Sequence, residues 1–154
     1  MLIEFENLKL NLKYLLLDYT GTLSEHGKPI ECVGDKLIKL SENFEKIYVL
    51  TADTFGTAEK ELKGLPVIVK VLKHPTSQGK VDVVKSLKAE YCLAIGNGNN
   101  DIEMLKLTKL SFATINRDGC NAKLLSIADI VFKSICDALD ALIEPRVLIS
   151  LLRE

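Results

Sequence analysis

A strand that ends in a single carboxylate constrains this chain more than any other feature. The apolar run Leu15–Leu17 leads straight into Asp18, and a polar turn that contains Gly21 follows at once. In open sheets of parallel strands, ligands bind at the carboxyl ends of the strands. The pattern therefore predicts an α/β fold with Asp18 at a ligand site, although an aspartate after a strand also suits the cap of a helix.

Apolar β-rich runs alternate with helical stretches, which is the pattern of βαβ units and a parallel sheet. The predicted strands are Tyr14–Asp18, Lys46–Thr51, Val67–Leu72, Tyr91–Gly96, Leu110–Ile115 and Asp129–Phe132. The predicted helices are Cys32–Asn43, Thr54–Leu62, Ser77–Lys88, Asp101–Leu107, Asn121–Ile127 and Ile135–Leu142. We expect residues 1–154 to form one domain, a Rossmann-like three-layer αβα sandwich with a mostly parallel sheet.

The two ends of the chain carry further predicted elements. Residues Leu2–Leu12 alternate apolar and polar positions around Asn7, which predicts a short antiparallel hairpin added at an edge of the sheet. Pro145 opens a last helix, Arg146–Leu152, at a position that tolerates proline. The apolar side chains of this helix must dock either on the sheet or on a second copy of the protein, so a homo-oligomer is one of the two expected arrangements.

Charge and hydropathy exclude several classes of partner. The formal net charge is −1 and the charged residues are dispersed, which argues against nucleic acid and anionic membranes as partners. No apolar run approaches the ~18 to 20 residues that span a bilayer, and the amino-terminal residues lack the features of a secretory signal. We therefore expect a cytoplasmic protein with no membrane partner.

The cysteines and histidines give no sign of a metal site of their own. The cysteines lie far apart and form no Cys-x-x-Cys pair, so we expect small buried thiols, which suits a reducing compartment. His26 and His74 stand alone and are expected in surface loops. The four cysteines are Cys32, Cys92, Cys120 and Cys136.

A threonine and a lysine are the next candidates for phosphate chemistry. Thr51 ends a strand just before a helix, so its hydroxyl and the free amides of that helix can bind a phosphoryl oxygen, although a plain helix cap fits equally. Lys80 follows a glycine at the start of a helix, where a cation can stabilise a charge-dense transition state. Lys73 and Lys85 are the alternatives, and a solvated surface position is common for any lysine.

A glycine-rich loop completes the set of candidate segments. The predicted strand that ends at Gly96 runs into Asn97-Gly98-Asn99-Asn100-Asp101 and then into a helix. Such a loop lets the backbone approach a metal or phosphate closely, with acidic or amide oxygens facing the ion. A strand–turn–helix connection without a ligand is the structural alternative.

The order of these four segments resembles that of the haloacid dehalogenase-like (HAD) superfamily. Asp18-Tyr19-Thr20-Gly21-Thr22 and the run Thr51-Ala52-Asp53 are similar to segments of the P-type ATPase phosphorylation domain, and the nearest resemblance is to the soluble P-type-ATPase-like branch. The motifs extend from residue 18 to residue 101. The intervals from Leu23 to Lys46 and from Thr51 to Lys80 are too short for a large cap domain.

The resemblance implies a role for each motif residue. It implies a Mg²⁺ site formed by Asp18, the carbonyl of Thr20 and Asn97, with Asp101 close by. The catalytic residues would be Asp18, Thr20, Thr51 and Lys80. Phosphate would be bound by Thr51, Lys80 and Asn100.

Two departures from the family pattern predict slow chemistry. HAD phosphatases use a second aspartate where this chain has Thr20, and they use it to protonate the leaving group and then to activate water. Its absence removes an acid–base step worth ~10²- to 10⁴-fold. Asn97 stands where the family has a metal-binding aspartate, which lowers the expected affinity for Mg²⁺.

These observations favour a Mg²⁺-dependent phosphohydrolase that forms an aspartyl phosphate. Its substrate would be a phosphorylated small molecule or a phosphate carried by a macromolecule, because a site without a cap is open. A nearly inactive phosphate-binding regulatory module of the same fold is the alternative. A signalling receiver domain is disfavoured because Asp18 lies on the first parallel strand, and an ion pump needs domains for which the chain has no length.

Overall fold

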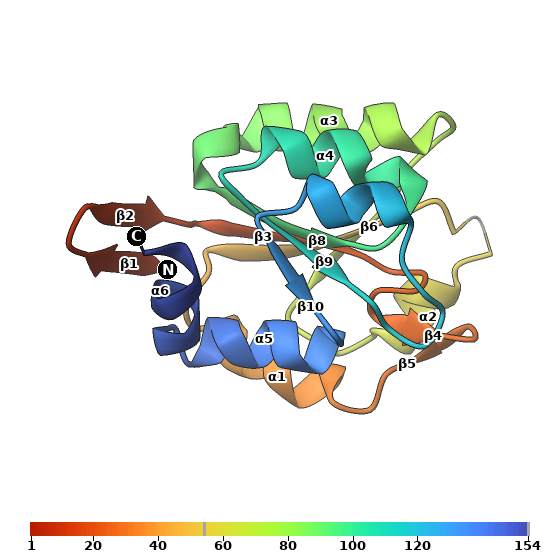
Figure 1. Ribbon diagram of the computed structural model, residues 1–154. Coiled ribbons are helices and arrows are strands. Elements are labelled where there is room, and N and C mark those ends of the chain that lie inside the picture. Colours follow the sequence, from red (N-terminus) through yellow and green to blue (C-terminus); the bar gives the residue numbers. More distant parts are fainter. Residues whose placement is uncertain (54, 154) are drawn as a thin grey trace.

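A six-stranded parallel sheet forms the centre of the computed structural model, which describes residues 1–53 and 55–153 (Figure 1). Its strands are β3 (Tyr14–Asp18), β6 (Lys46–Thr51), β7 (Ile68–Val71), β8 (Cys92–Gly96), β9 (Leu110–Thr114) and β10 (Ile130–Phe132). They lie in the order β10-β9-β8-β3-β6-β7. The predicted bounds of β3 and β6 are confirmed without change, and the other four strands are one or two residues shorter than predicted.

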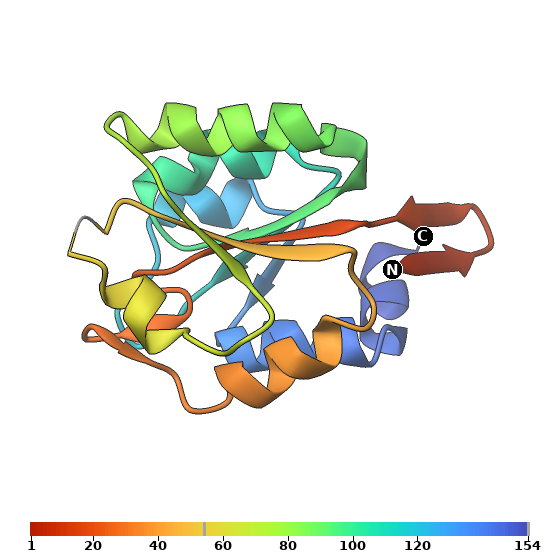
Figure 2. The ribbon, with the colours of Figure 1, turned by 180° about the vertical axis from the view of Figure 1, so that it is seen from behind.

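Helices cover both faces of the sheet (Figures 1 and 2). They are α1 (Val33–Leu40), α2 (Thr57–Glu61), α3 (Thr76–Leu87), α4 (Ile102–Leu107), α5 (Ile135–Ile143) and α6 (Arg146–Leu152), with 3₁₀ helices η1 (Ala89–Tyr91), η2 (Asn99–Asp101) and η3 (Ala122–Ser126). Helix α1 packs beside α5 on one face, and α3 packs beside α4 on the other. The predicted three-layer αβα architecture is confirmed.

Two predicted helices need comment. The segment predicted as the helix Asn121–Ile127 is the 3₁₀ helix η3, because the short segment buries only Leu124 and closes in tight turns. The predicted helix Thr54–Leu62 appears as the shorter α2, and its predicted first residue lies outside the described residues.

The central strand β3 is buried on both faces. Successive side chains of a strand point to opposite sides of the sheet. Leu15 and Leu17 accordingly belong to the core under α1 and α5, whereas Leu16 belongs to the core under α3 and α4. This explains why the strand reads as a continuous apolar run, and it leaves Asp18 at the end of a strand that neighbours hold on both sides.

The amino-terminal hairpin forms as predicted but in another place. Strands β1 (Leu2–Phe5) and β2 (Leu8–Asn11) pair antiparallel in a sheet of their own, so the prediction of an edge position is wrong. The reason is that β2 leads directly into β3, both of whose sides are already paired with β6 and β8. The hairpin projects beside α6, whose Leu148 is buried in the core of the same chain.

The expectation of four buried thiols holds only for Cys92, because two cysteines are oxidised and Cys120 is half-buried. Cys32 and Cys136 form a disulfide with a Cα–Cα distance of 6.0 Å, while Cys92 and Cys120 are free. The bond joins the starts of α1 and α5 across a separation of 104 residues, which no local spacing can indicate. The cysteines therefore no longer support a reducing compartment.

Short connections surround the carboxyl ends of the strands. The hairpin of β4 (Ser24–Glu25) and β5 (Lys28–Pro29) lies between β3 and α1, and only α2 and β7 lie between Thr51 and α3. The predicted absence of a large cap domain is confirmed. Among the helices in the described ranges, none combines the length and the apolar character that crossing a membrane requires.

Candidate active site

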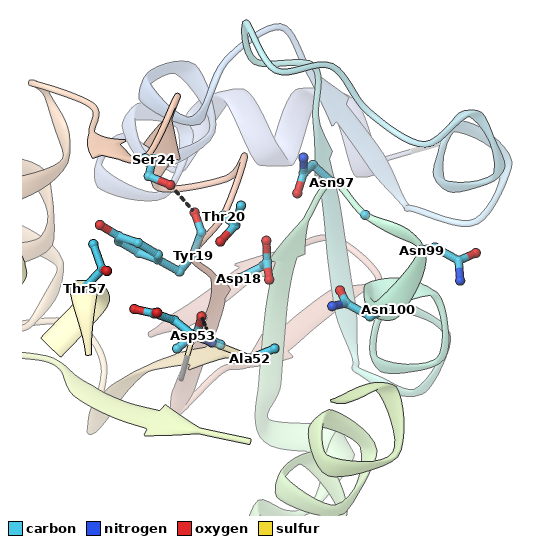
Figure 3. Close-up of a pocket in the computed structure, with 13 residues that line it drawn as sticks. Asp18, Tyr19, Thr20, Ser24, Ala52, Asp53, Thr57, Asn97, Asn99 and Asn100 are labelled. Carbon is cyan, nitrogen blue, oxygen red and sulfur yellow. Dashed lines mark hydrogen bonds between the residues drawn. The ribbon is translucent and has the colours of Figure 1, made fainter. Parts of the chain in front are cut away.

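A cavity of about 650 Å³ opens at the carboxyl ends of β3, β6 and β8. The chain passes from β3 to β6 on one side and later returns to β8 on the other, so the strand order reverses here. Doubly wound sheets bind ligands at such a position. The lining residues are Asp18, Tyr19, Thr20, Ser24, Gly27, Thr51, Ala52, Asp53, Thr57, Asn97, Gly98, Asn99 and Asn100 (Figure 3).

Lys80 joins two carboxylates behind the cavity. Its Nζ lies 2.6 Å from Oδ1 of Asp18 and 2.5 Å from Oδ1 of Asp101. It also donates to Oδ1 of Asn100 at 3.2 Å. The lysine side chain is fully buried, whereas Asp18 also lines the cavity. One buried cation therefore fixes the aspartate of the first motif and the aspartate of the last.

Burial and charge act in opposite directions on these groups. Burial, together with the charge of Asp101, raises the pKa of Asp18 from 3.8 to about 7, although Lys80 and the Thr22 hydroxyl act to lower it. Burial alone would lower the pKa of Lys80, but the carboxylates of Asp18 and Asp101 outweigh it and raise that pKa. The lysine therefore keeps its charge, and Asp18 is poised between its two protonation states near neutral pH.

Asp101 folds the glycine-rich loop around itself. Its Oδ2 accepts hydrogen bonds from the backbone N–H groups of Asn97 at 3.0 Å and Gly98 at 2.9 Å. A Cβ at Gly96 would lie 2.5 Å from Cγ of Asp101, so the strand must end in glycine. Because Oδ1 binds Lys80 and Oδ2 binds the backbone, neither oxygen is turned to the cavity in this arrangement. The metal-binding role implied for Asp101 stays a prediction.

The turn after Asp18 is equally compact. The carbonyl oxygen of Tyr19 accepts the backbone N–H groups of Leu23 at 2.9 Å and Ser24 at 3.0 Å. Gly21 has a φ of +78°, a conformation that side chains disfavour, and its Cα faces the amide of Asn97 too closely to carry a Cβ. The sharp turn brings the hydroxyl of Thr22 back toward the nucleophile candidate.

A carboxylate oxygen of Asp18 and the amide oxygen of Asn97 both lie close to the hydroxyl of Thr22. The hydroxyl of Thr22 lies 3.2 Å from Oδ2 of Asp18 and 3.1 Å from Oδ1 of Asn97. One hydroxyl has one proton, so it can donate to only one of these two acceptors at a time. Two acceptor oxygens that share a single hydrogen-bond donor form a site that suits a hard cation such as Mg²⁺. The donor set therefore fits the metal that the sequence resemblance implies.

The structure brings the other predicted residues to the same cavity. Thr51 is buried at the end of β6, and its Oγ1 accepts the backbone N–H of Asp53 at 3.1 Å, which leaves the hydroxyl proton for a ligand oxygen. Thr20 is exposed and Asn100 is half-buried, and both residues line the cavity. Lys80, being fully enclosed, lies behind this lining, so its predicted contact with phosphate stays a prediction.

The alternatives weighed from the sequence lie elsewhere. Lys73 and Lys85 are exposed and have no part in the lysine–aspartate network described above, and His26 and His74 are exposed as predicted. Sequence reasoning gave no role to several other lining residues, although some of them lie within the motifs quoted above. They are Tyr19, Ser24, Gly27, Ala52, Asp53, Thr57, Gly98 and Asn99, of which Asp53 and Thr57 were within reach as neighbours of Thr51.

Solved structures with the same fold include phosphatases. Deoxy-D-mannose-octulosonate 8-phosphate phosphatase from Haemophilus influenzae, in a cobalt-bound form, matches with a TM-score of 0.73 and 15% identity over 94% of each chain. A 3-deoxy-D-manno-octulosonate 8-phosphate phosphatase from Moraxella catarrhalis, in complex with magnesium, phosphate and KDO, matches with a TM-score of 0.70 and 15% identity. This match covers 93% of the present chain and 94% of the other. At these identities, the likeness shows the fold.

A family model for haloacid dehalogenase-like hydrolases matches residues 81–142. The chain belongs to the HAD-like hydrolase superfamily. Among curated relatives, this HAD protein is 27% identical over 143 residues to sodium/potassium exporting P-type ATPase 1 of Saccharomyces cerevisiae. The match covers 89% of the HAD chain but 13% of the yeast ATPase. The distant similarity to P-type ATPases predicted from Thr20 and the Thr51 segment is thus confirmed.

Proposed function

We propose that this HAD protein is a Mg²⁺-dependent phosphatase that forms an aspartyl phosphate on Asp18 and turns over slowly. The observation that carries the proposal is the position of Asp18, which lines the cavity while Lys80 holds its Oδ1 at 2.6 Å. An oxygen of Asp18 attacks phosphorus and the bond to the leaving oxygen breaks. Water then attacks the aspartyl phosphate, which releases phosphate and restores the carboxylate.

Buried charges prepare Asp18 for this reaction. Lys80 favours the ionised form that attacks, and it offsets the charge that gathers on the phosphoryl group in the transition state. The hydroxyl of Thr51, at the end of β6, donates to a phosphoryl oxygen, and Asn100 offers a second polar contact. Asp101 acts through Lys80, because it binds the ammonium group at 2.5 Å and does not line the cavity.

A divalent cation fits beside Asp18. Asp18, Asn97 and the carbonyl of Thr20 would hold it, and Mg²⁺ there would supply positive charge for binding and polarising the phosphoryl oxygens. Support comes from the two acceptors that share the single proton of Thr22. The phosphatase from Moraxella catarrhalis was solved with magnesium, and the one from Haemophilus influenzae with cobalt.

The absence of an acid at position 20 sets the expected rate. Thr20 lies exposed at the cavity, where it cannot donate or accept a proton near neutral pH. The leaving oxygen and the attacking water must therefore exchange protons with solvent. Both half-reactions lose an assistant that is usually worth ~10²- to 10⁴-fold, and hydrolysis of the aspartyl phosphate is expected to limit turnover.

The charge of the cavity bears on the substrate. The structural relatives named above are phosphatases of a sugar acid phosphate. Among the described lining residues, the charged ones are Asp18 and Asp53, and none is lysine, arginine or histidine. A carboxylate on the leaving group would meet no cation there. We infer that phosphate esters of neutral alcohols, borne by a small molecule or a macromolecule, are preferred over those of sugar acids.

The test is hydrolysis of p-nitrophenyl phosphate by the wild-type chain and by Asp18→Asn. We expect Mg²⁺-dependent turnover that the substitution abolishes, because the amide keeps the shape of the side chain but loses the nucleophilic charge. Asp82→Asn, an exposed aspartate on α3, is the matched control and should keep full activity. Turnover that survives in purified Asp18→Asn would exclude the covalent mechanism.

A nearly inactive phosphate-binding module is the second candidate, and Thr20 and Asn97 together favour it. Both residues replace the aspartates on which HAD phosphatases depend. Under this alternative the wild-type chain binds inorganic phosphate with Mg²⁺ in calorimetry but shows no turnover above that of Asp18→Asn. Binding without turnover would therefore replace the phosphatase assignment.

A further inference from the structure

Asn116 connects two segments that lie far apart in the sequence. It follows β9 and is buried, with 5% of its surface exposed. Its Nδ2 donates to the carbonyl oxygens of Gly21 at 3.0 Å and Thr22 at 2.7 Å. Its Oδ1 accepts the backbone N–H of Ile135 at 2.8 Å. Every hydrogen bond of this amide thus ties the turn after Asp18 to the first residue of α5.

Residues that follow Asn116 in the chain bind Asn97, in the loop after β8. The carbonyl oxygen of Gly119 accepts Nδ2 of Asn97 at 3.2 Å, and the backbone N–H of Asn121 donates to the Asn97 carbonyl at 2.8 Å. Because the amide nitrogen is bound to Gly119, Oδ1 of Asn97 turns toward Thr22. The 116–121 loop therefore sets the orientation of the side chain at the predicted metal position.

The same loop also holds the small hairpin at the mouth of the cavity. Oδ2 of Asp118 accepts the backbone N–H of His26 at 3.0 Å. The backbone N–H of Arg117 donates to Oε1 of Glu25 at 3.1 Å. These contacts are more exposed than those of Asn116, so we expect them to contribute less.

We propose that Asn116 is a positioning residue for phosphoryl transfer, and that the 116–121 loop holds the turn after Asp18 and Asn97 in one arrangement. The proposal rests on the proposed function for its catalytic consequence. The turn carries Thr22, whose hydroxyl contacts both Asp18 and Asn97. A small shift of the turn therefore moves the contacts of the nucleophile, and misplacement by about 1 Å can cost about 10²-fold in rate.

The two functions of the Asn116 amide can be separated by one substitution. Asn116→Asp keeps an oxygen that accepts the N–H of Ile135 at the start of α5. It loses the donor to Gly21 and Thr22, and it places a negative oxygen against their carbonyl oxygens. If Asn116 serves only to cap α5, this variant behaves like wild type. Asn116→Ala removes both functions and serves as the second variant.

Ser111→Ala is the matched control. Ser111 is a buried residue near the opposite end of β9, and its hydroxyl binds Oδ2 of Asp129 at 2.9 Å. The hydroxyl also accepts the backbone N–H of Asp129 at 3.2 Å, so its loss removes two side-chain hydrogen bonds from the same strand without touching the turn after Asp18. The control therefore reports the effect of a lost polar contact on stability alone.

Two measurements decide the proposal. The first is kcat for p-nitrophenyl phosphate with Mg²⁺, and the second is hydrogen exchange at the backbone amides of Leu23 and Ser24, which bind the carbonyl of Tyr19. We expect both Asn116 variants to lose about 10²-fold in kcat and to exchange faster at these amides, while Ser111→Ala keeps wild-type values. Wild-type kcat and exchange in Asn116→Asp would overturn the proposal.

The exchange measurement does not depend on catalysis. If the wild-type chain shows no Asp18-dependent turnover, the proposed function fails. Faster exchange at Leu23 and Ser24 in Asn116→Asp would then still support the positioning role. Unchanged exchange would overturn that role, whatever the activity of the wild-type chain.

Discussion

The cavity has two walls of different construction. The anchored wall consists of the turn at residues 18–24 and the loop at residues 96–101, and buried hydrogen bonds join it to Lys80 and Asn116. The open wall consists of residues 51–53 and 55–57. Beyond the buried Thr51, its described residues are exposed or half-buried, and Phe55 is 93% exposed.

The difference in construction matches a difference in expected roles. Asp18 is held by Thr22 of the anchored wall and by the buried Lys80 to which that wall is joined, and burial there strengthens electrostatic interactions and holds charges in fixed positions. Asp53 of the open wall instead accepts the backbone N–H groups of Phe55 and Ala58, which lie in its own segment. We therefore expect substitutions in the anchored wall to change the rate of chemistry, and substitutions in the open wall to change the choice of substrate.

Removal of Lys80 should give the largest effect and tests the anchored wall directly. Lys80→Met leaves Asp18 and Asp101 buried without their shared cation. We expect a loss of about 3 to 5 kcal/mol in the free energy of unfolding near pH 8. We also expect a fall of about 10²- to 10³-fold in kcat. Denaturant unfolding and steady-state hydrolysis of p-nitrophenyl phosphate measure the two quantities.

Lys85→Met is the control for this prediction. Lys85 lies on the same helix, α3, but is exposed. Its replacement should leave both the free energy of unfolding and kcat close to wild type. A similar loss in the two variants would mean that the buried lysine has no special part in the anchored wall.

Thr20→Asp should raise turnover, since it restores a proton donor at the edge of the anchored wall. A carboxyl group there can protonate the leaving oxygen and then activate water, a step usually worth ~10²-fold or more. The added charge near Asp18 opposes part of this gain, because it further raises the pKa of the nucleophile. Rapid-quench measurement should show a shorter-lived phosphoenzyme in the variant than in the wild-type chain.

Thr20→Asn separates the proton from the shape of the side chain. The asparagine has the size of aspartate but does not titrate, so it should leave the lifetime of the phosphoenzyme unchanged. An equal lifetime in all three proteins would show that position 20 does not limit the second half-reaction. The argument from Thr20 for slow turnover would then fail.

The raised pKa of Asp18 predicts a pH dependence of stability in the metal-free protein. Burial, with the charge of Asp101, raises this pKa to about 7, so the folded chain holds a proton that the unfolded chain releases near pH 4. The free energy of unfolding should therefore fall as pH rises from about 4 to about 7, by at most about 1.4 kcal/mol per pH unit. Asp18→Asn should lack this component.

Unfolding of the two proteins in the presence of a chelator, at pH values from 4 to 8, measures the dependence. The difference between wild type and Asp18→Asn isolates the titration of this one group from that of the other carboxylates. Parallel curves would show that Asp18 is ionised across the whole range. The anchored wall would then stabilise the charge more than its burial opposes it.

The sequence predicted those parts of the molecule that local patterns determine. Strand β3 could be assigned to the residue because Leu15–Leu17 is buried on both faces and Asp18 ends the run. The position of Asp18, Lys80 and Asp101 in one cluster followed from motif order together with the geometry of a parallel sheet. Most of the anchored wall could therefore be predicted from the sequence.

Contacts between segments that lie far apart in the sequence could not be predicted in this way. Asn116 binds the carbonyl oxygens of Gly21 and Thr22. Every residue has a backbone carbonyl oxygen, so the residue types do not indicate which carbonyl a distant side chain will bind. The disulfide between Cys32 and Cys136 likewise depends on the packing of α1 beside α5. The hairpin at residues 2–11 was placed wrongly because its alternating pattern shows a half-buried strand and not the neighbour that covers it.

The smallest expected effect concerns the open wall. Asp53 accepts the backbone N–H groups of Phe55 at 3.0 Å and Ala58 at 2.8 Å, and these bonds help to hold its pKa below the usual range. Asp53→Asn keeps a side chain that suits this capping position and removes the charge. We expect the ratio of kcat/KM for gluconate 6-phosphate to that for glucose 6-phosphate to rise a few-fold, with little change in kcat for p-nitrophenyl phosphate.

The control is Glu59→Gln, at an exposed acid on α2 outside the described cavity lining, and it should leave the ratio unchanged. A fall in kcat for the aryl phosphate as large as that from an anchored-wall substitution would erase the distinction between the two walls, because Asp53 would then act on the chemistry itself.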